Sequence, residues 1–245
     1  MKLIEQHPWT DKDVERHWDD VADIYVDENH KVSDAHNQRF LVTMEHLRLT
    51  PGMKILNVTS RDCELDDFIR SAQPDVEVIN AEISSGLMGV AAKLRPQAIQ
   101  VKLAGYSQLP FADGEFDAVV SLEALEHVAQ PVAFLRELRR VAKADSQLIL
   151  SCPPRTSEPG YRVYTALCGG HGEGPHRFPW SGEVKKMFVA SGWKLEKHFG
   201  TVLMPVGPGW WRNGWERILK MLPFLGEFGI RQFFVAHRVN DEELG

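Results

Sequence analysis

Apolar and polar positions follow two different periods along the chain. In the stretch 11–49, apolar side chains such as Trp18 and Tyr25 recur every three or four residues, which predicts helix. Pro51-Gly52 ends this pattern, and short apolar runs then alternate with helical spacings. The predicted strands are 54–58, 76–80, 98–102, 116–121 and 146–151, and the predicted helices are 64–72, 85–93 and 131–144. This alternation predicts an α/β fold with a parallel sheet covered by helices.

The pattern loosens after residue 154. Residues 155–179 are rich in Gly, His and Pro, and we expect a long loop, which in a compact domain is typically functional. The spacing then predicts a helix, two strands and a helical segment between these strands, at 181–191, 193–204, 230–239 and 210–228. Seven strands with right-handed crossovers give a Rossmann-like, doubly wound, mostly parallel sheet with helices on both faces.

Without repeats or a flexible linker, residues 1–245 are expected to form a single domain. Within it, residues 1–50 would form an N-terminal helical cap, and residues 155–180, with Tyr25, would border the substrate cleft as a lid.

Composition and charge narrow the class of protein. Hydrophobic residues make up 43% and charged residues 25%, which is typical of a globular protein and excludes bulk disorder. The net charge of -6 argues against a broad nucleic-acid-binding surface. Three cysteines indicate a reducing compartment, and no apolar run has membrane-spanning length. We therefore expect a cytoplasmic protein without a membrane span.

Three segments in a fixed order resemble a known family. They are Leu49-Thr-Pro-Gly-Met-Lys-Ile-Leu-Asn-Val58, Leu109-Pro-Phe-Ala-Asp-Gly-Glu-Phe-Asp-Ala-Val-Val-Ser121 and Glu126-His-Val-Ala-Gln-Pro131. Together they resemble the class I S-adenosylmethionine-dependent methyltransferases, over roughly residues 18–239. The resemblance implies S-adenosyl-L-methionine as the cofactor and methyl transfer as the reaction.

The turn after the first predicted strand departs from this family. In the family an acidic residue precedes a turn with three alternating glycines, whereas here Asn57 replaces the acid and Thr59, Arg61 and Cys63 replace the glycines. Glycine suits this turn because the backbone approaches the cofactor closely and adopts positive φ. Two interpretations stay open: Arg61 pairs with the cofactor's carboxylate, or the pocket has decayed or been remodelled.

Other cofactor contacts are implied by the same resemblance. Glu82 follows the second strand, where the family carries an acid that binds the ribose hydroxyls; its alternative role is a solvated loop carboxylate. Tyr106 stands near the adenine position and would stack on it or simply pack on the surface. Ser121, at the end of the fourth strand, and Tyr25 complete the predicted contacts.

A metal site is a further hypothesis. If the segment after Ser121 is helical, Glu123, Glu126 and His127 lie on one face, as ligands suited to Mg²⁺, Mn²⁺, Fe²⁺ or Zn²⁺. The pattern resembles the metal motif of small-RNA 3′-terminal 2′-O-methyltransferases and of ubiquinone-pathway O-methyltransferases, and His176 would be the fourth ligand. Alternatively, these side chains only pack and hydrogen-bond, and His127 or His176 acts as a general base.

The leading functional hypothesis is O-methylation of a small-molecule hydroxyl. The alternative is a methyltransferase-fold protein that has lost methyl transfer and serves as a binding module, a scaffold or a repurposed enzyme. An RNA-terminus methyltransferase is disfavoured by the acidic charge, so nucleic acid is not an expected partner. A homodimer would follow if the Trp210–Trp215 group formed an exposed apolar patch.

Overall fold

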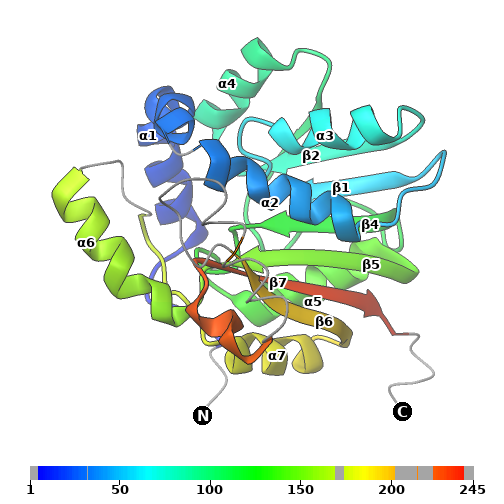
Figure 1. The fold of residues 1–245 in the computed structure, drawn as a ribbon. Coiled ribbons are helices and arrows are strands. Elements are labelled where there is room, and N and C mark those ends of the chain that lie inside the picture. The colour runs from blue at the N-terminus through cyan, green and yellow to red at the C-terminus, as the bar shows by residue number, and fades with distance from the viewer. Residues whose placement is uncertain (1–4, 32, 169–173, 202–213, 215–222, 240–245) are drawn as a thin grey trace.

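The computed structural model describes residues 5–31, 33–168, 174–201, 214 and 223–239, which form one seven-stranded sheet with helices around it (Figure 1). The strands are β1 (Lys54–Val58), β2 (Glu77–Glu82), β3 (Ile99–Lys102), β4 (Phe116–Leu122), β5 (Ala142–Cys152), β6 (Trp193–Thr201) and β7 (Arg231–Arg238). The α-helices are α1 (Asp11–Lys31), α2 (Ser33–His46), α3 (Glu64–Ala72), α4 (Ser85–Leu94), α5 (Pro131–Val141), α6 (Glu158–Cys168) and α7 (Ser181–Ala190). Two 3₁₀ helices are η1 (Arg155–Ser157) and η2 (Pro223–Phe228).

The strand order is β3-β2-β1-β4-β5-β7-β6. The first five strands run parallel, and β7 pairs antiparallel with both β5 and β6. The predicted doubly wound, mostly parallel sheet is therefore confirmed. Because β1 and β4 lie in the middle, their carboxyl ends are flanked by neighbours on both sides, which is where such sheets place their ligands.

Helices bury both faces of the sheet. Leu56 of β1 packs in a core cluster with residues of α1, α4, α5 and α7, whereas its neighbour Ile55 packs in a second cluster with α2 and α3. Successive side chains of a strand point to opposite faces, so one apolar run supplies both clusters. This explains why the sequence shows continuous apolar runs, the pattern of strands buried on both faces.

Several boundaries differ from the sequence predictions. The N-terminal stretch is divided between α1 and α2, and β5 already begins at Ala142, inside the predicted helix 131–144. The predicted loop 155–179 is partly wrong, because η1 and α6 occupy residues 155–168. Pro159 did not exclude this helix, since a proline in the first helical turn loses no intrahelical hydrogen bond. Of the predicted helical segment 210–228, only residue 214 and η2 are described, and 202–204 lie outside the described residues.

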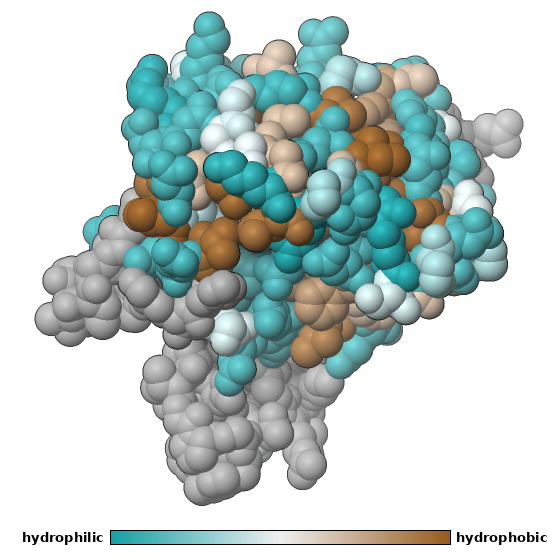
Figure 2. Space-filling view, turned by 90° about the horizontal axis from the view of Figure 1, so that it is seen from above, coloured by the Kyte–Doolittle hydropathy of each residue, from teal (hydrophilic) through white to brown (hydrophobic). Residues whose placement is uncertain are grey.

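The surface carries no single large apolar area on the face shown in Figure 2, where separate hydrophobic patches lie among hydrophilic residues. Exposed large apolar side chains are distributed over several elements, for example Ile24 on α1, Leu41 on α2 and Leu94 on α4. Within the described ranges, no helix has both the length and the apolar character needed to cross a membrane.

Candidate functional site

The candidate site lies where the parallel strands end. The turn 59–63 follows β1, Glu82 ends β2, Tyr106 follows β3, and the segment 123–127 follows β4. Helix α1 lies beside these ends, on the side of the molecule that also holds α6 (Figure 1). The site is therefore framed by the sheet edge and α1.

The turn 59–63 has the backbone of a glycine turn without a glycine. Thr59, Arg61 and Cys63 have φ angles of 59°, 53° and 63°, in the left-handed region. Such a conformation costs an L-residue about 1–2 kcal/mol. Hydrogen bonds hold the turn in place: Cys63 N–H donates to the Ser60 carbonyl (2.8 Å) and Ser60 N–H to the Ala81 carbonyl (3.2 Å).

Glu82 anchors this turn from inside. Its side chain is fully buried, and its carboxylate accepts backbone hydrogen bonds from Arg61 (2.8 Å), Ile83 (2.8 Å) and Ser84 (2.9 Å). The alternative role of a solvated loop carboxylate is therefore wrong. Three amide donors satisfy the charge that burial would otherwise leave unpaired. Binding of ribose hydroxyls by Glu82 stays a prediction. The ribose would have to share the two carboxylate oxygens that already accept these three backbone hydrogen bonds.

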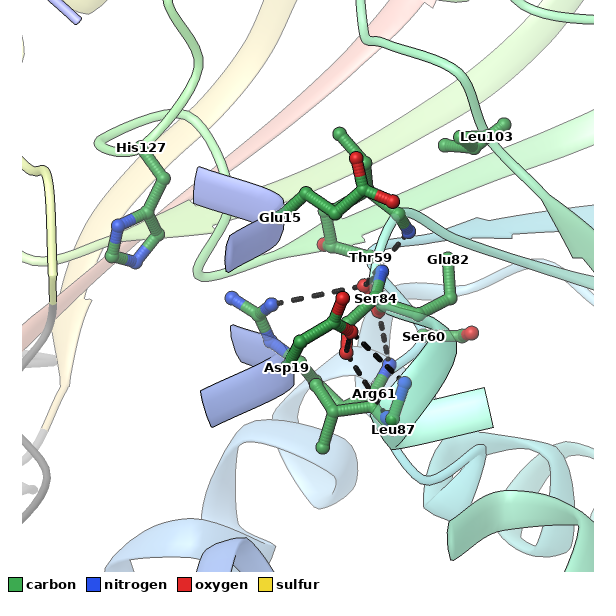
Figure 3. Close-up of polar contacts among 12 residues, drawn as sticks. Glu15, Asp19, Thr59, Ser60, Arg61, Glu82, Ser84, Leu87, Leu103 and His127 are labelled. Atoms are coloured by element: carbon green, nitrogen blue, oxygen red, sulfur yellow. Dashed lines mark hydrogen bonds and ion pairs between the residues drawn. The ribbon is translucent and has the colours of Figure 1, made fainter. Parts of the chain in front are cut away.

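The Arg61 side chain fills the space above the turn. Its guanidinium carbon lies 3.7 Å from the centre of the Trp18 ring. Nη1 lies 4.0 Å from Oε1 of Glu82, and Figure 3 shows the side chains of Arg61 and Glu82. Only 7% of the side chain is exposed. Stacking on an indole face and the nearby carboxylate both stabilise the guanidinium in this desolvated position.

Helix α1 is fastened over the site by three acidic residues spaced one turn apart. Asp11 accepts from the backbone N–H of Tyr106 (2.8 Å), and Glu15 forms an ion pair with Lys102 (2.5 Å). Asp19 accepts from the N–H of Gly86 (2.9 Å) and from the hydroxyl of the α4 N-cap residue (2.6 Å). The end of β3, the loop after it and the start of α4 therefore each contribute a partner to α1.

The remaining predicted contacts lie in the interior. Tyr106 is 1% exposed and packs edge-on against Phe134, and burial raises the pKa of its phenol well above the ordinary value. Tyr25 is also buried, which raises its pKa, and its hydroxyl accepts a long hydrogen bond from Arg39 (3.4 Å). The Ser121 hydroxyl is buried, with no hydrogen-bond partner among the described residues.

Asn57 belongs to a buried polar chain. Its amide donates to the Asn80 carbonyl oxygen (2.9 Å), and the Asn80 amide donates to Asp66 (3.0 Å). Asp66 accepts in turn from Arg70 (2.5 Å). Asn57, which stands where the family has an acidic residue, is thus linked to α3 through the hydrogen bonds of Asn80 and Asp66.

The cavity described beside the turn is too small for S-adenosylmethionine in this conformation. The cavity beside the turn, lined by residues that include Asn57, Thr59 and Arg61, measures about 10 Å³. Pockets for cofactor-sized ligands typically measure roughly 300–1,000 Å³. The backbone has the form of a cofactor turn, but Arg61 and Tyr106 occupy the interior around it.

The helix on which the metal hypothesis depends is absent. Residues 123–127 form bends and turns, and Glu123 itself has a φ of 52°. Its carboxylate accepts from the Ser151 hydroxyl (2.6 Å) and from Arg231 (3.0 Å). The prediction of a common helical face for Glu123, Glu126 and His127 is therefore wrong, because the chain bends as β4 ends.

His127 is 1% exposed and lies near His176, with their ring centres 6.4 Å apart. Nδ1 of His127 is 3.1 Å from the Pro175 carbonyl, and Nε2 is 3.8 Å from Glu126. Within the part of the chain that the structure describes, no group of three or more His, Cys, Asp or Glu side chains could hold a metal ion. The described structure does not assemble the predicted set of four ligands.

Trp18, Asp19 and Arg39 were not predicted as site residues. The spacing of Trp18 indicates only a helix, and charged side chains such as Asp19 and Arg39 do not contribute to the apolar period. The acidic residues at 11, 15 and 19 do share a helical spacing, which is the signal that could have revealed a polar, site-facing stripe on α1.

A second network lies behind Arg39. Nε2 of His36 is 2.9 Å from Glu64 and 3.0 Å from Arg39. Burial and the Arg39 charge lower the pKa of His36 to about 4, although Glu64 opposes the shift. The same contact with His36 lowers the pKa of Glu64, against the effect of its partial burial.

Known proteins resemble this chain in both sequence and fold. The model of a methyltransferase domain matches residues 67–150. The demethylmenaquinone methyltransferase of Beutenbergia cavernae is 29% identical over 158 residues, which cover 64% of this chain and 63% of that protein. The match therefore spans less than two thirds of that relative.

Two solved structures share the fold. A SAM-dependent methyltransferase of Thermotoga maritima superposes with a TM-score of 0.67, at 14% identity, over 92% of this chain and 99% of its own. The [4+2]-cyclase SpnF superposes with a TM-score of 0.70, at 14% identity, over 97% of this chain and 99% of its own.

The strand order, with β7 antiparallel beside β5, defines the class I methyltransferase fold. Within this fold, the model of a methyltransferase domain matches residues 67–150, and the structural likeness to the Thermotoga maritima protein is one of fold.

Proposed function

We propose that this chain transfers a methyl group from S-adenosylmethionine to a small molecule. The observation that carries the proposal is the left-handed backbone at Thr59, Arg61 and Cys63. Together these residues store roughly 3–6 kcal/mol of strain, three times the cost of one. Such strain persists only where the surrounding structure imposes it, and it clusters at functional sites. In addition, Arg61 is a long side chain that can move, whereas the turn's backbone is fixed by Glu82.

The acceptor that we propose is a small ring compound bearing a hydroxyl or quinol group. Tyr161 and Phe178 pack edge-on with ring centres 5.8 Å apart, and the His176 ring lies 4.9 Å from Phe178. Such an aromatic group within the proposed lid, residues 155–180, suits a flat ring. The sequence analysis favours a hydroxyl oxygen as the methyl acceptor, whereas the relatives are named for demethylmenaquinone. Mass and NMR analysis of the methylated product distinguishes oxygen from carbon.

His127 is the side chain that we propose as general base, with His176 beside it. A base within hydrogen-bonding reach of the acceptor hydroxyl raises the rate of methyl transfer. Replacement of His127 with Gln is expected to lower kcat about 10²-fold or more while cofactor binding is retained. Unchanged kcat would exclude this role.

The second candidate is a family member that has lost methyl transfer. The stacked Arg61 and the buried Tyr106 favour it, because both occupy space around the cofactor turn. One fold hosts many functions, and this fold also occurs in a protein whose name is that of a cyclase.

Calorimetric titration with S-adenosylmethionine and thermal unfolding distinguish the two candidates. If the unmodified chain binds, saturation at about 100 times Kd stabilises it by about 2.7 kcal/mol, a rise in Tm of about 5–10 °C. Radiolabelled methyl transfer to a panel of quinols and catechols then tests the activity.

Arg61→Gly and Cys63→Gly form a matched pair for this experiment. Both remove one left-handed side chain, but only the first empties the space over Trp18. Binding by Arg61→Gly alone would establish the second candidate, because Arg61 then excludes the cofactor. Absence of binding in all three chains at millimolar cofactor would overturn the methyltransferase proposal.

For partners and location we propose a cytoplasmic protein that binds a small molecule and no nucleic acid, consistent with the net charge of -6. Retention of labelled RNA at about 0.15 M salt would contradict this. Sedimentation measurements decide whether the chain forms a homodimer.

A further inference from the structure

The segment 7–11, which leads into α1, is hydrogen-bonded to the loop that carries His127. The indole Nε1–H of Trp9 donates to the carbonyl of His127 itself (2.6 Å). Two residues earlier, the His7 N–H donates to the carbonyl of Ala129 (2.8 Å). We propose that Trp9 is a positioning residue, which holds His127 where its ring can act on an acceptor. This inference rests on the proposed function, in which His127 is the general base.

The indole of Trp9 is itself held in place. Its ring lies parallel to the ring of His7, with 4.4 Å between the ring centres and 3° between the planes. His7 is buried, and both burial and the nearby charge of Arg177 lower the pKa of its ring, so this ring is uncharged at pH 7. Trp9 also packs against the core cluster of α1. The stacked neighbour and the core therefore fix the direction in which the indole N–H points.

Asp11 connects the same loop to α1. One of its carboxylate oxygens accepts from the Ala129 N–H (3.3 Å), and the other accepts from the Tyr106 N–H (2.8 Å). Trp18, on the same helix, packs edge-on against the His127 ring, with 5.5 Å between the ring centres. The N-terminal part of the chain thus contacts both the backbone and the ring of His127.

Residues before α7 contact this loop as well. The Arg177 N–H donates to the Glu126 carbonyl (2.9 Å), and Nδ1 of His127 lies 3.1 Å from the Pro175 carbonyl. A carbonyl oxygen only accepts hydrogen bonds, so this contact places the proton of the neutral ring on Nδ1. Nε2 then carries the lone pair that a general base needs. The position of the His127 backbone decides whether the ring keeps this contact.

The bond from Trp9 ends on the backbone of His127, so Trp9 acts through His127. The efficiency of a general base depends on its distance from the proton that it removes, and a misplacement of about 1 Å can cost 10²-fold in rate. Loss of the indole N–H is therefore expected to lower kcat and to leave KM nearly unchanged.

Trp9→Phe tests the inference, because it keeps an aromatic ring beside His7 and removes the N–H donor. Trp9 is only partly buried, so the fold is expected to survive. Trp193→Phe is the matched control. The indole of Trp193 also donates to a backbone carbonyl, that of Leu135 (2.9 Å), but Trp193 begins β6, at the edge of the sheet away from His127. Trp193 is buried, so the control should lose at least as much stability, which urea unfolding measures.

The first readout is the long-range ¹H–¹⁵N NMR spectrum of the histidine rings, which needs no substrate. The signals of His127 are those that are missing from His127→Gln, and they report the tautomer and surroundings of the ring. In Trp9→Phe these signals should shift, with a larger share of the ring protonated on Nε2. In Trp193→Phe they should stay where they are in the unmodified chain.

The second readout is steady-state kinetics with the quinol or catechol that the unmodified chain methylates fastest. Trp9→Phe should lower kcat about tenfold, which is less than the loss expected for His127→Gln, with KM within about twofold. Trp193→Phe should change kcat by less than about twofold, since it leaves the loop around His127 intact.

Two outcomes would overturn the inference. One is that the His127 signals do not shift in Trp9→Phe. The other is an equal loss of kcat in the two Trp variants, because stability and not position would then be the cause. Failure of the proposed function gives a different result, in which the unmodified chain transfers no methyl group to any compound of the panel. The ring spectra alone then decide whether Trp9 positions His127.

Discussion

The carboxylate of Glu82 explains how the turn after β1 keeps its shape without glycine. Three amide hydrogen bonds end on this one buried side chain, and one of them comes from Arg61 itself. Because an unsatisfied buried carboxylate is costly, the carboxylate and the turn stabilise each other. The left-handed residues are thus held by a contact outside their own segment.

His36 predicts a pH dependence of stability. Its pKa is about 4 in the folded protein and ordinarily 6.5, so between these values the unfolded chain binds more protons. The stability that depends on neutral His36 is complete above pH 6.5 and is lost as the pH falls toward 4. From pH 6.5 to pH 5 we expect a loss of about 1.5 kcal/mol. Urea unfolding at both pH values measures it.

The matched variant is His36→Gln, which can still hydrogen-bond to Glu64 but does not take up a proton. Its free energy of unfolding should vary less over the same pH interval, by about the 1.5 kcal/mol that His36 contributes. An equally steep loss in both chains would show that other groups cause it.

At the scale of elements, α1 acts as a cover over the strand ends. One face supplies Val14, Trp18 and Tyr25 to the core, and the acidic residues beside them bond to the loops. Helix α1 thus supplies both buried apolar side chains and the hydrogen bonds that hold it against the loops. Beside the turn, the described residues leave a small cavity next to Arg61.

Gly86 permits the close crossing of α1 and α4. A Cβ at this position would lie 2.8 Å from the Ala22 Cβ and 3.3 Å from the Asp19 carbonyl. Gly86→Ala is therefore expected to destabilise the protein by about 1–3 kcal/mol, as overpacking does. Gly89 lies one turn later in α4 with nothing within 4 Å, and Gly89→Ala should be neutral or stabilise by up to about 1 kcal/mol.

Chemical unfolding of both glycine variants checks this prediction. If Gly86→Ala proves as stable as Gly89→Ala, the two helices are not in the close contact described. If Gly86→Ala is less stable, its affinity for S-adenosylmethionine becomes informative, because a displaced α1 would also release Trp18 from Arg61.

At the scale of the whole molecule, stability is expected to be unequal between the sheet and its cover. β1 and β4 are hydrogen-bonded to strands on both sides, and their central side chains are fully buried. Helix α1 is fastened at one face by ion pairs that are partly exposed, such as Glu15 with Lys102. Elements with fewer buried contacts open at lower free energy.

Hydrogen exchange followed by mass spectrometry tests this inequality. Amides of α1 should exchange through a partial opening, faster than those of β4, and a bound cofactor would slow them. Identical protection of α1 and β4 would mean that the molecule opens only as a unit, and that no route to the cofactor turn exists short of global unfolding.

The sequence by itself determined the sheet, most element boundaries and the unusual turn. Apolar periodicity is a local property, so the runs at 54–58 and 116–121 and the helical spacing of 131–141 could be read directly. The replacement of three glycines at 59, 61 and 63 was equally visible, as was the acid at Glu82. Each of these features depends on residues close together in the chain.

Only the tertiary structure decided what those residues contact. Arg61 stacks on Trp18, 43 positions earlier (61 minus 18), and Glu123 pairs with Arg231, 108 positions later. The bend that replaces the predicted helix at 123–127, and the helix α6 within a predicted loop, likewise depend on how the chain packs. Periodicity tells which face of an element is apolar, but it does not tell which distant side chain will meet it. The turn covered by Arg61 is formed by such contacts, because long polar side chains take their positions from partners far away in the sequence.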